Sequence, residues 1–164
     1  MRKYVLIGLI FTGISSFFVW NQNISVKTEY TTQVVKPTTP LVTINKLEIP
    51  VEVMRTEAEV QKGLSGRPYL DQDKGMLFIF AKSDIYRFWM PDMHFPIDII
   101  WINNNQVVDI SKNVPTDFDP VKPKFYSPSK KANYVLEVNA GFSKKNNIKI
   151  GDPFNFVQGR SEER

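Results

Sequence analysis

The sequence has 164 residues, of which 42% are hydrophobic and 23% are charged, the composition of a folded globular protein. It contains no cysteine, which excludes disulfides, thiolate metal sites and cysteine nucleophiles. The net charge is +4, but residues 1–40 hold four basic side chains and one acidic side chain, which leaves +1 for residues 41–164. A nearly neutral domain without basic clusters interleaved with aromatics is not expected to bind nucleic acid.

The first 20 residues have the pattern of an export signal or membrane anchor. Arg2 and Lys3 precede residues 4–20, a run of 17 residues without charge, and such a basic start stays in the cytoplasm. Seventeen residues is close to the shortest helix that spans a bilayer, and no small-residue cleavage pattern precedes Asn21. We therefore expect an uncleaved signal anchor that holds the domain outside the cytoplasm, in the periplasm or extracellular space. Secretion after cleavage is the alternative.

Composition divides the chain into four parts. The anchor at 1–20 is followed by a polar, threonine-rich stretch at 21–40, which predicts a flexible tether. Residues 41–158 alternate apolar runs with turn residues and predict one β-rich domain. Residues 159–164 predict a disordered tail.

Within the domain, apolar residues alternate over 47–53 and predict a half-buried strand, with Pro50 at an edge or at its beginning. Thr56 and Glu59 form a capping-box pattern that starts a short helix, and Gly63 should end it. Apolar runs at 76–80, 86–90 and 97–102 predict three strands, and three asparagines at 103–105 predict a turn into a strand at 106–110.

The second half of the domain begins with an irregular surface loop, because residues 112–131 contain four prolines. A strand at 134–138, a short helical turn at 140–147 and a last strand at 154–157 follow. About seven strands with one or two short helices predict a mainly β fold, a compact β-sandwich or squat barrel.

Three charged residues lie within or beside strongly apolar runs, where an unpaired charge is costly: Arg67, Asp98 and Glu137. At least one carboxylate should be partly buried and paired, and arginine suits a bidentate pair. The same three residues with Trp89, whose ring can stack on a ligand, form the candidate ligand-binding site. Structural ion pairing and core packing are the alternative interpretation.

A second constellation combines Met90, Met93 and His94. Thioether and imidazole ligands suit Cu(I), and the predicted location outside the cytoplasm is compatible with such a site. Met90 ends an apolar run, where methionine commonly fills core gaps, and a metal site needs a turn at Pro91 and Asp92.

A set of short motifs covers about residues 45–157 in a fixed order. They are Arg55-Thr56 with Glu59, Gly63-Leu64-Ser65-Gly66-Arg67, Gly75-Met76-Leu77-Phe78, Phe88-Trp89-Met90, Pro96-Ile97-Asp98-Ile99, Tyr134-Val135-Leu136-Glu137-Val138-Asn139-Ala140-Gly141 and Ile150-Gly151-Asp152. Together they resemble the domain of unknown function 192 family, also called uncharacterised ACR proteins. The resemblance implies a compact β-rich single domain, often behind an export signal, and no established activity. Family members commonly have a basic residue and Asn-Thr after the Trp-Met pair, where this chain has Pro91-Asp92-Met93-His94.

The leading hypothesis is a non-enzymatic, membrane-tethered domain outside the cytoplasm that binds a small ligand or an envelope protein. No phosphate-binding loop, dinucleotide-binding motif, zinc-protease motif or serine-hydrolase motif occurs, so we expect no cofactor. One alternative is a hydrolase of envelope glycans that uses Asp98 and Glu137. The other is a Cu(I)-binding protein.

Overall fold

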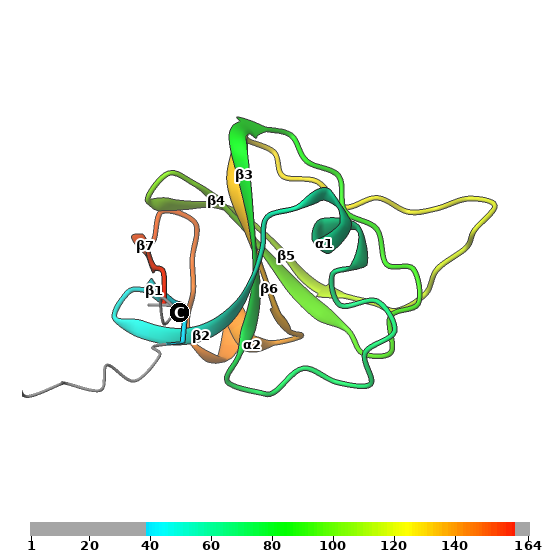
Figure 1. Ribbon diagram of the computed structural model, residues 1–164, viewed down its shortest axis with the longest axis horizontal. Coiled ribbons are helices and arrows are strands. Elements are labelled where there is room, and N and C mark those ends of the chain that lie inside the picture. The colour runs from blue at the N-terminus through cyan, green and yellow to red at the C-terminus, as the bar shows by residue number, and fades with distance from the viewer. Residues whose placement is uncertain (1–38, 160–164) are drawn as a thin grey trace, which may run out of the picture. The chain divides into compact units, whose positions relative to one another are not determined.

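The computed structural model describes residues 39–159, which form seven strands and two short helices (Figure 1). The strands are β1 (Leu41–Ile44), β2 (Leu47–Met54), β3 (Gly75–Asp84), β4 (Ile97–Asn103), β5 (Gln106–Val114), β6 (Ala132–Asn139) and β7 (Phe154–Val157). The helices are α1 (Glu57–Lys62) and α2 (Phe142–Lys145). All seven strands belong to one strongly curled, half-barrel sheet in the order β5-β4-β6-β3-β2-β1-β7. The prediction of a mainly β fold is confirmed.

Neighbouring strands pair antiparallel with one exception, the parallel pair of β2 and β3. Parallel neighbours need a crossover connection, and here residues 55–74, with α1, make it. Pro50 pairs with Leu41 of β1, whereas pairing of β2 with β3 begins only at Val51. The proline therefore lies where β2 has a neighbour on one side only, which is where a residue without an N–H is tolerated.

The two edges of the sheet meet at one end, which begins to close the barrel. The Val107 amide donates to the Asp152 carbonyl at 3.0 Å, and the Phe154 amide donates to the Asn105 carbonyl at 2.7 Å. These bonds join the start of β5 to the approach of β7. They satisfy edge groups that an open sheet leaves unpaired.

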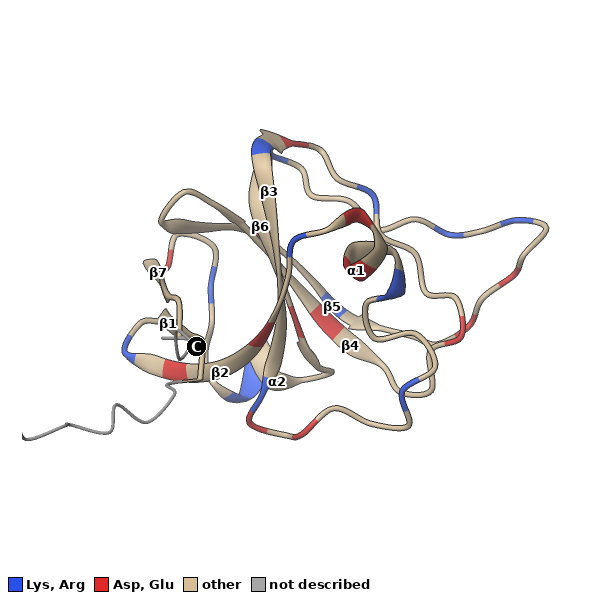
Figure 2. Ribbon diagram, viewed as in Figure 1, with Lys and Arg blue, Asp and Glu red and all other residues tan. Residues whose placement is uncertain are grey.

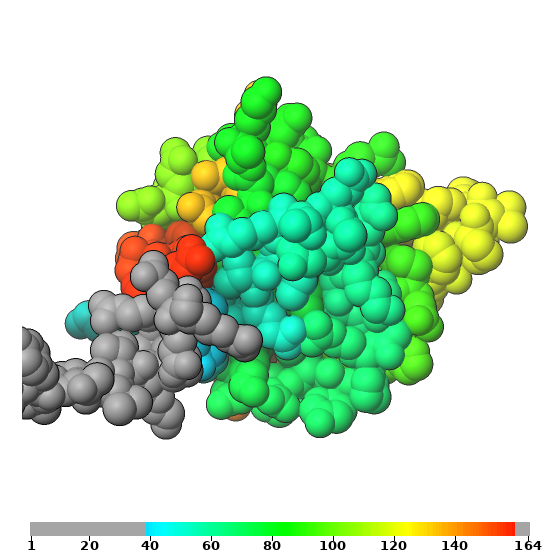
Figure 3. All heavy atoms as spheres, in the orientation of Figure 1, coloured from blue at the N-terminus to red at the C-terminus, as the bar shows by residue number. Residues whose placement is uncertain are grey.

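Each face of the sheet has its own hydrophobic core. The barrel core draws residues from all seven strands: Val42, Ile44, Ile49, Val51, Leu77, Ile100, Ile102, Val107, Leu136, Val138, Ile148 and Phe154. The loop-covered core lies on the other face: Leu64, Leu70, Met76, Phe78, Met90, Ile97, Ile99, Trp101, Val114, Ala132 and Val135. Charged residues are concentrated in the loops and on α1 (Figure 2). The crossover from β2 to β3 forms a continuous surface over one side of the domain (Figure 3).

One predicted strand is not formed in the described residues, and one observed strand was not predicted. Residues 86–90 are not a strand, and only Phe88 pairs in a bridge, with Tyr126 of the long loop between β5 and β6. The apolar run has another cause, because Tyr86, Phe88 and Met90 belong to the loop-covered core. Strand β1 was not predicted, although the equally short strand β7 was. It joins β2 through a two-residue turn in which Asn45 and Lys46 both have positive φ.

Within residues 39–159, no helix is long and apolar enough to cross a membrane. The predicted anchor at 1–20, almost all of the tether at 21–40 and almost all of the tail at 159–164 lie outside the described residues.

Candidate functional site

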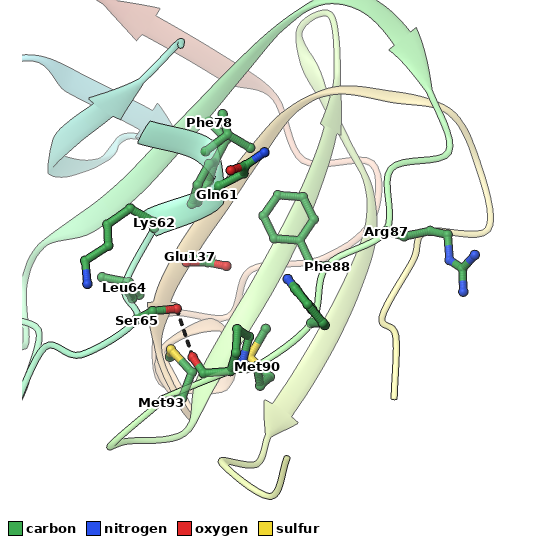
Figure 4. Close-up of a pocket in the computed structure, with 14 residues that line it drawn as sticks. Gln61, Lys62, Leu64, Ser65, Phe78, Arg87, Phe88, Met90, Met93 and Glu137 are labelled. Carbon is green, nitrogen blue, oxygen red and sulfur yellow. Dashed lines mark hydrogen bonds between the residues drawn. The ribbon is translucent and has the colours of Figure 1, made fainter. Parts of the chain in front are cut away.

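A pocket of about 170 Å³ opens on the loop-covered face of the sheet (Figure 4). Its walls come from α1 and the turn after it, from β3, from residues 87–93 and from β6. The lining residues are Val60, Gln61, Lys62, Gly63, Leu64, Ser65, Phe78, Arg87, Phe88, Trp89, Met90, Pro91, Met93 and Glu137. This volume is close to that of an apolar protein cavity of roughly 150 Å³ that binds benzene, so a compact ligand fits.

One side of the pocket is formed by α1 and the turn after it, and α1 begins at the predicted capping box. The Glu59 amide donates to the Thr56 hydroxyl at 3.3 Å, and the Thr56 amide donates to the Glu59 carboxylate at 2.9 Å. The bond from the Thr56 amide, together with one from the Arg55 amide at 2.9 Å, favours the charged carboxylate and lowers the pKa of Glu59. The helix ends after Lys62 at Gly63, which has a φ of 45°. The chain therefore turns sharply and brings Leu64 and Ser65 over the sheet.

Two hydrogen bonds join this turn to the opposite wall. The Ser65 hydroxyl donates to the Pro91 carbonyl at 2.8 Å, and the Gly66 amide donates to the Asp92 carbonyl at 2.8 Å. Asp92 has a φ of 51°, a conformation that aspartate adopts more readily than most residues. The turn at Pro91 and Asp92 thus shapes the pocket.

Phe88 anchors the segment that forms this opposite wall. Its amide and carbonyl each bond to Tyr126, at 2.8 and 2.7 Å. Its ring makes edge contacts with Phe78 and Trp101, with centroids 5.1 and 5.4 Å apart. Such contacts stabilise aromatic pairs by about 0.5–1.5 kcal/mol each, so the wall is held to the sheet although it is not a strand.

Glu137 lies at the floor of the pocket, on β6 in the middle of the sheet. Its strand neighbours are Met76 of β3 and Ile99 of β4, both fully buried. The Glu137 residue itself is 4% exposed, and its side chain makes no hydrogen bond or salt bridge within residues 39–159. Burial among apolar groups disfavours the charged form and raises the pKa of Glu137 from 4.5 to about 8.

The Glu137 carboxyl oxygens remain accessible from the pocket. Among the described residues, no polar side-chain atom that is sealed from solvent lacks a hydrogen-bond partner. Because the Glu137 oxygens have no partner within residues 39–159 and Glu137 lines the pocket, these oxygens retain contact with solvent there, and Figure 4 shows this side chain between the two walls. Glu137 is therefore a buried carboxyl group that a ligand can reach.

Asp98 is equally buried but serves a different purpose. It pairs with Val138 across β4 and β6 and contributes to the face opposite to Glu137. Its oxygens accept hydrogen bonds from the amides of Asn113, Gly141 and Ser143 at 2.8, 3.2 and 2.9 Å, and from the Ser143 hydroxyl at 2.6 Å. Asp98 thus ties the start of α2 and the end of β5 to β4.

Arg67 pairs with neither Asp98 nor Glu137. Its guanidinium forms a bidentate pair with Glu52 of β2, at 2.7 and 2.8 Å. The hydrogen bond from Arg67 lowers the pKa of Glu52, and the same bond raises the pKa of Arg67. Both side chains are partly exposed, so this is a surface ion pair outside the Glu137 pocket.

The structure also places the remaining predicted site residues. Trp89 lines the pocket with Glu137 and is 47% exposed, and its ring stacks on Phe125. Met90 and Met93 line the same pocket, but His94 does not, and its imidazole lies 3.3 Å from the Asp92 carboxylate. Among residues 39–159, no group of three or more His, Asp or Glu side chains is arranged to hold a metal ion.

Sequence reasoning missed most of the pocket wall. The turn residues Leu64 and Ser65, the ring of Phe88 and the side chains of Lys62 and Arg87 were not predicted as site residues. The sequence held only an indirect signal for these residues. A capped helix that ends at a glycine indicates a sharp change of chain direction, after which the next residues pack against another element. An aromatic run indicates residues that cover a hydrophobic core.

The fold and the pocket define a compact half-barrel domain with a ligand-sized hollow beneath a crossover connection. The model of the domain of unknown function 192 family, described as Uncharacterized ACR, matches residues 41–156, and the chain belongs to this family. No curated protein matches the sequence.

Two solved structures resemble the domain. A protein of unknown function from Novosphingobium aromaticivorans is 27% identical, with a TM-score of 0.63, and the match covers 74% of this chain and 94% of that one. A protein from Sinorhizobium meliloti described as a putative transcription regulator is 24% identical, with a TM-score of 0.64, and the match covers 74% and 96% of the two chains. The second likeness establishes the fold alone.

Proposed function

We propose that this protein binds a small ligand in the Glu137 pocket and is not an enzyme. The observation that carries the proposal is an unpaired carboxyl group, 96% buried, whose oxygens still reach a pocket with aromatic and thioether walls. A buried ionisable group without a partner destabilises a fold. A carboxyl group in such a position is a candidate for ligand binding, because a ligand can supply the missing partner.

Binding is favoured over catalysis because no second carboxyl group lines the pocket with Glu137 among the described residues. No charged side chain contributes to its raised pKa, and no titratable group bonds to it within residues 39–159. A glycan hydrolase needs two carboxyl groups on either side of the scissile bond, whereas Asp98 and Glu137 lie on opposite faces of the sheet. The carboxylate-pair hypothesis therefore lacks geometric support.

The binding test uses the full-length chain and a panel of fragments with about 6 to 12 heavy atoms, followed by thermal unfolding. A fragment at 100 times its Kd adds about 2.7 kcal/mol to the free energy of unfolding. Ser65→Phe places a ring in the pocket, and Ser127→Phe makes the same change at an exposed position elsewhere.

The proposal expects fragments that stabilise the wild type and the Ser127→Phe variant but not the Ser65→Phe variant. Circular dichroism shows whether each variant is folded, and Glu137→Gln provides a second, smaller change in the pocket. Fragments that stabilise the Ser65→Phe and Glu137→Gln variants as well as the wild type would place binding elsewhere and contradict the proposal.

We further propose that the domain stands outside the cytoplasm on an N-terminal anchor. The support is the uncharged run at 4–20 behind Arg2 and Lys3. A C-terminal alkaline phosphatase fusion, which is active only after export, should be active and remain with the membrane fraction. Replacing Leu6 and Ile7 by aspartate should abolish export, and an active fusion after that change would contradict the proposal.

A further inference from the structure

The neutral side-chain hydrogen-bond donors that line the pocket are mostly engaged elsewhere. The Gln61 amide nitrogen donates to Glu57 at 3.3 Å, and the Ser65 hydroxyl donates to the Pro91 carbonyl. Of the neutral side-chain donors that line the pocket, the Trp89 indole N–H alone has no partner within residues 39–159. An anionic ligand needs several converging donors, and the neutral side chains of the pocket do not offer them.

Both cations at the pocket rim are directed away from Glu137. The Arg87 guanidinium lies 4.1 Å from the centroid of the Phe125 ring, outside the pocket. The Lys62 ammonium lies over Gly66, 3.3 Å from where a β-carbon on that glycine would be. Figure 4 shows the side chains of Lys62 and Arg87 pointing outward on opposite sides. Neither makes a salt bridge to Glu137.

The groups that remain available to a ligand are electron-rich. They are the two Glu137 oxygens, the thioethers of Met90 and Met93, the ring of Phe88, and the ring of Trp89, one face of which stacks on Phe125. Aromatic faces attract cations, tryptophan most strongly, and a carboxylate neutralises them. Such surroundings match a positively charged group with a small apolar body.

We infer that the pocket takes a small organic cation, an amine or quaternary ammonium compound, whose charge meets the Glu137 carboxylate against the aromatic and thioether walls. The inference rests on the proposed function, because it names the ligand class of the same pocket. The cation supplies the partner that Glu137 lacks and makes use of walls that offer no donor set for an anion.

Binding of a permanent cation should then depend on pH through Glu137. The elements packed around this side chain contribute Met76 and Phe78 from β3, Ile99 from β4, Leu64 from the turn, and Met90 from the opposite wall. The other charged groups among the lining residues are Lys62 and Arg87, and neither makes a salt bridge to Glu137. Glu137 must release a proton to pair with the cation, so affinity should rise with pH up to about 8 and then level off.

The test compares choline with its uncharged isostere 3,3-dimethylbutan-1-ol and with butyrate, by calorimetry on the full-length chain. The Kd of choline should fall about tenfold per pH unit from pH 6 to 7 and become constant above about pH 8.5. At the higher pH, the alcohol and butyrate should bind at least about tenfold more weakly than choline.

Three variants complete the test. Glu137→Gln should weaken choline binding at least about tenfold at pH 8.5 and remove its pH dependence. Glu48→Gln makes the same change on an exposed glutamate of β2 and should leave the profile unchanged. His94→Gln removes the imidazole next to Met93, outside the pocket, and should also leave the profile unchanged.

Tighter binding of butyrate or of the alcohol than of choline, lost in the Ser65→Phe variant, would overturn the inference and leave the proposed function standing. Failure of choline to bind at millimolar concentrations and pH 8.5 would overturn it as well. The proposed function fails separately, when the fragment panel yields no binding that depends on Ser65 or Glu137.

Discussion

Asp98 and Glu137 are two buried carboxyl groups on neighbouring strands, yet their surroundings are opposite. Asp98 accepts four hydrogen bonds from Asn113, Gly141 and Ser143, whereas Glu137 accepts none within the described residues. Asp98 of β4 pairs with Val138 of β6. The next residue of β4, Ile99, pairs with Glu137, the residue before Val138. One step along a strand changes the face of the sheet, and it separates a structural group from a candidate binding group.

The difference shows that burial alone does not reveal what a carboxyl group does. Around Asp98 the fold supplies backbone donors at the start of α2, and the carboxyl group organises the chain. Around Glu137 it supplies Met76, Ile99 and aromatic rings, and the carboxyl group is left with its oxygens toward a pocket. The presence or absence of hydrogen-bond donors around a buried carboxyl group therefore separates its structural role from a candidate binding role.

The largest expected effect comes from removing the structural carboxyl group. Asp98→Ala leaves three backbone amides and the Ser143 hydroxyl without their acceptor, and should lower the free energy of unfolding by about 4 kcal/mol. Urea denaturation at neutral pH measures this. A loss below about 1 kcal/mol would show that water replaces the carboxyl group and that the contrast with Glu137 is smaller than the hydrogen bonds indicate.

Glu137→Gln should raise the free energy of unfolding, whereas Asp98→Ala should lower it. The folded state raises the pKa of Glu137 from 4.5 to about 8, so it binds a proton more tightly than the unfolded state does. Its contribution to stability is fully present below pH 4.5 and is lost as pH rises through about 8. The variant has no carboxyl group to ionise and therefore avoids this loss. Its advantage in free energy of unfolding over the wild type should grow by about 2 kcal/mol as the pH rises from 6 to 8.

Urea denaturation across that pH range checks the prediction for Glu137. The exposed Glu48→Gln variant is the control, and its stability should follow the wild type at every pH. Parallel curves for the wild type and the Glu137→Gln variant would show that the carboxyl group is solvated, and would remove the contrast with Asp98.

A smaller effect is expected at the helix that forms one wall of the pocket. Thr56→Ala removes the hydroxyl that accepts from the Glu59 amide and should cost about 1 kcal/mol of stability. Thr56→Ser keeps the hydroxyl and should be close to the wild type. Thermal unfolding distinguishes them, and equal losses in the two variants would show that the threonine methyl group, not the cap, is responsible.

The smallest effect is expected for Arg67→Ala. The pair with Glu52 is partly exposed, so solvent screening should limit the loss to less than about 1 kcal/mol. Because the pKa of Glu52 is lowered in the folded state, this contribution is present above pH 4.5 and is lost as pH falls below that value. A loss of several kcal/mol in urea denaturation at pH 7 would mean that Arg67 acts on more than this surface pair.

The sequence allowed much of the fold to be predicted, because strands and caps depend on local patterns. Alternation over β2, the apolar runs of β3 and β4 and the Thr56 capping box needed no knowledge of distant contacts. The strand prediction for residues 86–90 was wrong. An apolar run in a loop that covers a hydrophobic core has the same sequence pattern as a buried strand.

The candidate site could be predicted only in part. Glu137 and Trp89 were identified from their types and apolar surroundings, and both line the pocket. The sequence could not show that Asp98 and Glu137 occupy opposite faces, because the pairing register determines this. It also could not show that Arg67 finds Glu52, because that contact depends on the path of the crossover.

The parallel pairing of β2 and β3 has a consequence for how this family can diversify. Parallel neighbours cannot be joined by a tight turn, so a connecting segment must pass over the sheet, and here that segment carries α1, Leu64 and Ser65 across Glu137. Insertions or substitutions in the segment can reshape the hollow while every strand keeps its register. The shape of this hollow in homologous domains can therefore change through one connection, without redesign of the sheet beneath it.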